Sequence, residues 1–128
     1  MIGVDIVNVE RIKSLAEKDK NNKVFLTSEL DYVSSKSNVS KIGDKFSARE
    51  YSLAGIFASK EALSKAFGVG IGDQIGFSDI EINHEENGKP FFVMNSKISS
   101  LLKSHNASKI NLSISHDAGI AIAVVEIV

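Results

Sequence analysis

Four polar side chains capable of chemistry lie close together in one otherwise apolar segment, Tyr51–Gly72. The surrounding aromatic, aliphatic and alanine residues predict a buried helix that ends at the glycines. Uncompensated buried charge is costly, so Lys60, Glu61 and Lys65 need partners. One interpretation is an i,i+4 ion pair between Glu61 and Lys65, with Lys60 reaching out to water. The other is a ligand site, where Glu61 binds a hard cation and the lysines neutralise phosphates.

A further carboxylate, Asp5, interrupts a β-branched segment that begins at Ile2 and predicts the first strand. Aspartate is disfavoured inside strands, so its presence there needs a reason. An edge strand with Asp5 facing solvent is one explanation. A carboxylate held on a rigid strand to bind a cation is the other. The sequence pattern alone does not choose between them.

The composition is that of an ordinary globular protein and excludes several kinds of chemistry. A length of 128 residues suggests a single domain, 1-128. The absence of cysteine excludes disulfides, thiolate metal sites and cysteine nucleophiles. A net charge of −1 gives no general attraction to nucleic acid or membrane, and the longest apolar run, Ala118–Val125, is too short to span a bilayer. Because the amino terminus lacks a signal-peptide pattern, we expect a cytoplasmic protein.

The elements that must position these side chains predict an α+β fold, with a small antiparallel sheet packed against a long central helix. A helix from about Val9 to Asp19, capped by Asn8, follows the first strand. The other predicted elements are a short helix over 27–35, a strand over 77–83, a helix over 96–104, a half-buried strand over 110–115 and a more fully buried return strand over 120–128.

Two further features each have a structural and a functional explanation. The segment from Arg11 to Lys23 carries five Lys/Arg against two acidic residues, which fits either a solvated helix face or a docking surface for an acidic partner. His116 lies at a strand–turn junction, where a lone histidine is more often structural but is placed to contact a ligand.

The chain resembles the 4'-phosphopantetheinyl transferases, and among them the single-unit holo-acyl-carrier-protein synthase branch. The resemblance rests on Gly3–Ile6 (GVDI) and Phe57–Lys65 (FASKEALSK), with Asn87–Pro90 (NGKP) and Ser113–His116 (SISH) in support. It covers essentially the whole chain, in order. Asn8, Ile56 and Val69 depart from residues that are common in the family.

This resemblance implies an activity and an assembly. The activity is transfer of 4'-phosphopantetheine from coenzyme A to a serine of apo acyl carrier protein, for fatty acid biosynthesis. Adenosine 3',5'-bisphosphate is the other product. The assembly is a homotrimer with active sites between subunits.

The resemblance also implies roles for individual residues. Asp5 and Glu61 would be ligands of Mg²⁺. Glu61 and Lys65 would be catalytic, and Glu61 or a metal-bound water is the candidate base. The expected coenzyme A contacts are Lys60, Ser64, Lys65 and His116. The expected contacts to the carrier protein are Arg11, Lys13 and Lys18.

Two other functions are consistent with parts of the pattern. A non-catalytic module that binds coenzyme A or a nucleotide would not require the two metal carboxylates. A structural oligomerisation domain would use Glu61 and Lys65 as a simple ion pair and would bind no coenzyme A.

Overall fold

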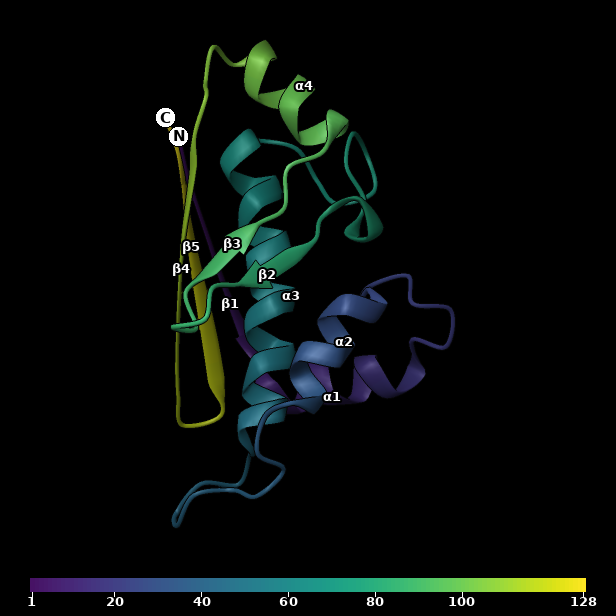
Figure 1. The fold of residues 1–128 in the computed structure, drawn as a ribbon, viewed down its shortest axis with the longest axis vertical. Helices are drawn as coiled ribbons and strands as arrows, with labels where there is room; N and C mark the ends of the chain where they lie inside the picture. Colours follow the sequence, from purple (N-terminus) through teal and green to yellow (C-terminus); the bar gives the residue numbers. More distant parts are fainter.

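The computed structural model describes residues 1–128, arranged around one long helix, α3 (Ala48–Phe67). This helix lies against a three-stranded antiparallel sheet of order β1-β5-β4, as Figure 1 shows. The strands are β1 (Ile2–Asn8), β4 (Ile110–Asp117) and β5 (Ile120–Ile127). The predicted α+β fold, a small antiparallel sheet packed with a long central helix, is confirmed.

The remaining elements surround α3 on the sides that the sheet leaves free (Figure 1). They are α1 (Val9–Lys18), α2 (Thr27–Ser34), the hairpin of β2 (Ile82–His84) and β3 (Pro90–Phe92), and α4 (Ser96–Ser104). The strand predicted from residue 77 is wrong at its start. Residues Phe77–Asp79 form a 3-10 turn instead, which the Asp79 carboxylate closes by accepting from the backbone N–H of Gly76 at 2.8 Å. None of the helices has an apolar stretch long enough to cross a bilayer.

The local sequence explains where α3 begins and ends. At its start, the Ser47 hydroxyl accepts from the backbone N–H of Glu50, and the Glu50 carboxylate accepts from the backbone N–H of Ser47 at 2.9 Å. This reciprocal capping box satisfies N–H groups that have no partner inside the helix. At its end, Gly68 adopts a left-handed conformation with φ 75°, which costs glycine little.

Small residues let α3 lie very close to β1 and β5. A Cβ atom added at Gly3 would lie 2.0 Å from the carbonyl oxygen of Ala62 and 2.5 Å from the backbone nitrogen of Ala66. On the neighbouring strand, Ala121 and Ala123 are fully buried beneath the same helix. Because successive strand residues point to opposite faces, Asp5 shares the face of Gly3 and is directed toward α3.

The opposite face of the sheet carries apolar side chains that no element of the chain covers. They are Ile2, Val4, Ile6, Ile120, Ile122 and Val124, with exposures from 37% to 70%, and we call them the outer apolar patch. The β1–β5 register places Val4 opposite Val124 and Ile6 opposite Ile122. As predicted, β5 is more fully buried than β4, but only on one face, because only alternate residues of β5 point toward α3.

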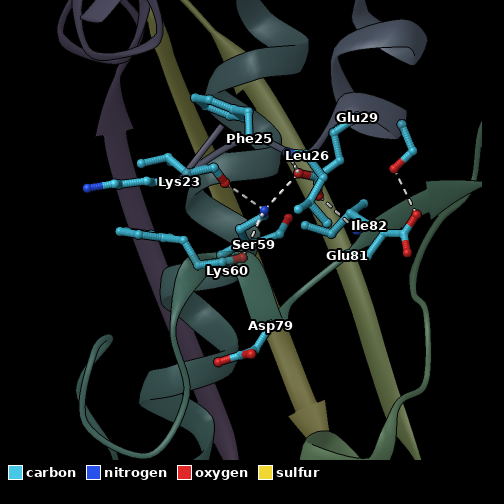
Figure 2. A network of polar contacts seen from close by, with 12 residues as sticks. Lys23, Phe25, Leu26, Glu29, Ser59, Lys60, Asp79, Glu81 and Ile82 are labelled. Carbon is cyan, nitrogen blue, oxygen red and sulfur yellow. Dashed lines mark hydrogen bonds and ion pairs between the residues drawn. The ribbon is translucent and has the colours of Figure 1, made fainter. Parts of the chain in front are cut away.

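A buried ion pair joins α2 to α3. The Lys60 ammonium donates to a Glu29 carboxylate oxygen at 2.7 Å, and both side chains have no exposed surface. Lys60 also donates to the carbonyls of Val24 at 2.7 Å and Phe77 at 3.2 Å. The other Glu29 oxygen accepts from the backbone N–H of Ile82 at 2.9 Å (Figure 2). This network ties three separate segments to the central helix.

The contact at Gly3 predicts a large loss of stability on a small substitution. Gly3→Ala should lower the free energy of unfolding by about 1–3 kcal/mol or more, because the new methyl group meets rigid helix backbone. Gly70→Ala is the matched control, since an added Cβ there has no atom within 4 Å. Urea unfolding followed by circular dichroism measures both. Equal stability of the two variants would contradict the close packing.

Candidate functional site

Strand β1 and helix α3 bring Asp5, Glu61 and Lys65 together on one flank of α3. The Lys65 ammonium donates to one Asp5 carboxylate oxygen at 2.9 Å and to the carbonyl of Val4 at 3.2 Å. The Asp5 side chain is only 13% exposed, so β1 is an edge strand but its aspartate does not face solvent. The alternative ion pair between Glu61 and Lys65 is not formed within 4.0 Å.

Both carboxylates in this group are in an unfavourable state. The second oxygen of Asp5 is buried and has no hydrogen-bond partner. Burial and the nearby charge of Asp5 raise the pKa of Glu61 above its ordinary value, against the lowering effects of Lys65 and Arg11. A buried unpaired oxygen and two neighbouring acids are what a cation would stabilise.

The donor set fits a magnesium ion better than a metal that needs a complete protein cage. No third acidic or histidine side chain joins Asp5 and Glu61 as a metal-binding group. Mg²⁺ is commonly held by one or two carboxylates, with water and substrate phosphates filling the other positions. Lys65 uses two of its three N–H donors within the chain, which leaves one for an anionic oxygen.

Two residues predicted to contact coenzyme A are not available to it. The family resemblance predicts that Lys60 contacts coenzyme A, but its ammonium is enclosed by Glu29 and backbone carbonyls. Ser64 is 1% exposed and donates to the carbonyl of Glu61 at 2.7 Å. Both predictions are corrected for the same reason. Other elements cover α3 on several sides, so the side of the helix that carries Lys60 and Ser64 is buried in the core and cannot reach a ligand.

His116 lies on a different flank of α3 and borders a second hollow. Its exposed ring stacks on Tyr51, with ring centroids 4.3 Å apart. The Tyr51 hydroxyl donates to the Asp44 carboxylate at 2.8 Å and accepts from the backbone N–H of Gly119 at 2.9 Å. The adjoining cavity of about 440 Å³ is lined by one cation, Lys41, and by two carboxylates, Asp44 and Asp117. Lys41 is its candidate contact for a phosphate.

The two groups lie at opposite edges of the sheet. Asp5 belongs to β1 and His116 to β4, and β5 lies between these strands. Helix α3 covers the inner face between them: Ala62 meets β1, whereas a Cβ at Gly55 would lie 3.0 Å from Ile114 of β4. The helix therefore separates Asp5, Glu61 and Lys65, which we call the acidic group, from the cavity beside His116.

The residues predicted for carrier docking divide into two sets. Arg11 and Lys18 lie on one side of α1 and line a groove of about 630 Å³. Lys13 lies elsewhere on the helix, where its ammonium is 3.0 Å from the Glu50 carboxylate and this partner raises the pKa of Lys13. Lys13 therefore lies outside the groove, because residues two apart in a helix point in different directions around its axis. Its contact with the carrier protein stays a prediction.

Several residues with clear roles were not singled out from the sequence. Lys23 also lines the groove of Arg11 and Lys18, which we call the basic groove. Asp19 fixes the position of Lys23 by accepting from its backbone N–H at 2.9 Å. Tyr51 orients His116, and Glu29 satisfies Lys60. Only Glu29 had a usable signal, because a buried lysine demands a distant carboxylate.

One departure from the family pattern has a local structural explanation. The Asn8 side chain accepts from the backbone N–H of Arg11 at 3.3 Å and caps α1. Asparagine is among the preferred capping residues, so this position stabilises the turn from β1 into α1.

Known proteins agree with this arrangement over the full length of the chain. The model of the 4'-phosphopantetheinyl transferase superfamily matches residues 1–125. The holo-acyl-carrier-protein synthases of Nautilia profundicola and Campylobacter fetus are each 41% identical over 128 residues, covering 98% of this chain and 96% of theirs. The crystal structure of Helicobacter pylori holo-acyl-carrier-protein synthase in complex with coenzyme A is 35% identical, with a TM-score of 0.78 and 100% of both chains covered. The chain therefore belongs to the 4'-phosphopantetheinyl transferase superfamily.

Proposed function

We propose that this protein is a holo-acyl-carrier-protein synthase. It transfers 4'-phosphopantetheine from coenzyme A to a serine of apo acyl carrier protein and releases adenosine 3',5'-bisphosphate. The observation that carries this proposal is the buried Asp5 carboxylate oxygen that lacks a partner, beside Glu61 and Lys65, in a chain that matches the superfamily over residues 1–125. We further propose that residues 1–128 form one transferase domain and that the protein acts in the cytoplasm, in fatty acid biosynthesis.

Asp5 and Glu61 are the proposed ligands of Mg²⁺. When bound, the ion supplies positive charge that holds the pyrophosphate of coenzyme A and stabilises the negative charge of the leaving group. The burial of Asp5 and the raised pKa of Glu61 support this assignment, since both favour an added cation.

Lys65 is the proposed phosphate-binding cation. Its ammonium is anchored by Asp5 and the Val4 carbonyl, while 53% of its side-chain surface stays exposed. A fixed cation of this kind aligns the reacting phosphate and offsets its charge. The Glu61 carboxylate, held on the same helix, is the candidate acceptor for the proton of the carrier's serine hydroxyl.

The nucleotide end of coenzyme A is assigned to the cavity that His116 and Lys41 line. This cavity and the acidic group lie at opposite edges of the sheet, with α3 between them. One ligand that uses both groups is therefore more readily held between neighbouring copies than within one chain. This geometry supports the active sites between subunits that the family resemblance implies.

The outer apolar patch supports a homotrimer. Six aliphatic side chains that are neighbours on one face of the sheet leave an exposed apolar surface, and such surfaces mark contacts between proteins. The patch lies on the face of the sheet away from α3, so a second copy can cover it without displacing the central helix. The family resemblance sets the expected number of copies at three.

The acyl carrier protein is assigned to the groove beside α1. Arg11, Lys18 and Lys23 give this groove an excess of positive charge over its one acidic residue, Asp19. An acidic partner is attracted and oriented by such a surface. The groove adjoins α3 near the metal pair, because the Arg11 guanidinium lies 5.6 Å from the ring centre of Phe57, one turn before Glu61.

Intact mass spectrometry of a carrier protein tests the proposed reaction. Apo acyl carrier protein incubated with this protein, coenzyme A and Mg²⁺ should gain the mass of one phosphopantetheine. A parallel sample with a chelator should gain nothing. If a competent carrier gains no mass while coenzyme A still binds in a titration, the protein is the non-catalytic binding module instead.

The metal assignment predicts opposite effects of Glu61→Gln on stability and on transfer. Because the pKa of Glu61 is raised on folding, its charged form destabilises the folded chain at neutral pH. The variant should therefore melt at a higher temperature without metal, and this gain should vanish in acid, where Glu61 is protonated in both states. Transfer should be lost.

Thermal melts with and without Mg²⁺ supply the independent measurement. The ion should raise the melting temperature of the unsubstituted protein and leave Glu61→Gln unchanged, because a ligand stabilises only the state that binds it. Asp31→Asn, at an exposed carboxylate on α2, is the matched control and should keep the magnesium response. A full response in Glu61→Gln would contradict the assignment.

The trimer predicts that a charge placed in the outer apolar patch breaks the assembly. The unsubstituted protein should elute with a mass of about 41 kDa, three times the 13.8 kDa chain, in size exclusion with light scattering. Val4→Asp should shift this to the monomer, because Val4 faces Val124 across the patch. Met94→Asp, at an exposed apolar residue outside the sheet, should leave the trimer intact. A monomeric unsubstituted protein would refute the proposed assembly.

A further inference from the structure

The buried ion pair of Lys60 and Glu29 touches no proposed substrate, yet Lys60 directly precedes Glu61 in the sequence. All three N–H donors of its ammonium have partners inside the chain. Burial lowers the pKa of Lys60, against the attraction of Glu29. Apolar side chains of similar volume often stabilise a core as well as a buried ion pair does, so stability alone is a weak reason for this one.

The network holds one surface segment from its inner side. Lys60 donates to the carbonyl of Val24, which belongs to the connection between α1 and α2. From the other side, Asp19 accepts from the backbone N–H groups of Lys23, Val24 and Phe25, at 2.9, 3.0 and 3.0 Å. Figure 2 shows this segment meeting the Lys60 ammonium beside Glu29. The segment is therefore fixed between a carboxylate outside and an ammonium inside.

This fixed segment forms one wall of the basic groove. Lys23 and Val24 line the groove opposite Arg11 and Lys18 of α1. The groove is close to Glu61, because the Arg11 guanidinium lies 5.6 Å from the ring centre of Phe57, one helical turn before Glu61. Because Lys60 directly precedes Glu61 on α3, its ammonium ties the groove wall to the turn of the helix that carries the proposed catalytic carboxylate.

We propose that Lys60 is a positioning residue for the acceptor, which holds the wall of the carrier groove at a fixed place relative to Glu61. The inference rests on the proposed transferase function. The occupant of the groove is the acidic surface of the acyl carrier protein, which the excess positive charge of the groove attracts. Loosening the wall misplaces the carrier, whereas the nucleotide cavity lies on the other flank of α3 and is not affected.

A split between the two Michaelis constants separates positioning from a merely structural role. Lys60→Met removes the ammonium and keeps an unbranched apolar chain, and Asp19→Ala releases the same segment from its solvent side. In both variants the KM for the carrier should rise about tenfold, as expected for a misplaced reactant, while the KM for coenzyme A stays within about twofold. Leu102→Ala, in the core of α4, is the control for general loss of stability. It should leave both constants unchanged.

Assays are run at a temperature where circular dichroism shows each protein folded. Asp19 is only partly buried, so Asp19→Ala keeps the test valid even where Lys60→Met does not fold. An unchanged carrier KM in a folded variant, or an equal rise in both constants, would overturn the positioning role alone. Absence of transfer by the unsubstituted protein would overturn the proposed function, and this inference with it.

Discussion

The contact between the backbone of Gly3 and the backbone of α3 at Ala62 and Ala66 constrains the rest of the structure. Two backbones can approach this closely only where neither carries a side chain between them. Asp5 lies on the same face of β1 as Gly3 and therefore points at Glu61 and Lys65. These two residues are one turn apart on α3, so both lie beside Asp5. Close packing thereby places two acids side by side, at a cost in stability that a bound cation would remove.

The position of α3 also separates the two groups of residues that we assign to the active site. With the helix lying over the middle of the sheet, the acidic group is on the β1 side and the stacked Tyr51–His116 pair on the β4 side. A single copy holds two separated halves of the proposed site. The outer apolar patch offers the means to bring halves from different copies together, because it lies on the free face of the same sheet. Catalysis and assembly in the proposed trimer then depend on one arrangement of helix and sheet.

Local sequence patterns predicted the elements that carry the site, but they did not predict which distant residues meet. The alternation around Ile114 and the apolar helix around Glu61 indicated the β4–β5 hairpin and α3 correctly. The partner of Lys60 lies 31 residues away at Glu29, and that of Lys13 lies on α3 at Glu50. Periodicity identifies a face and not the element that covers it. For that reason the sequence does not reveal that Lys60 and Lys13 pair with carboxylates of the same chain.

Complementation between two inactive variants tests most directly whether each active site combines residues of two copies. Glu61→Gln and His116→Ala damage opposite flanks of α3 and should each be impaired alone. Unfolded together in equal amounts and refolded, they should recover about a quarter of the unsubstituted activity, because one site in four then receives an intact residue from each neighbour. Separately refolded samples that are mixed just before the assay are the control. No recovery in co-refolded assemblies would contradict the shared site and place all the chemistry within one chain.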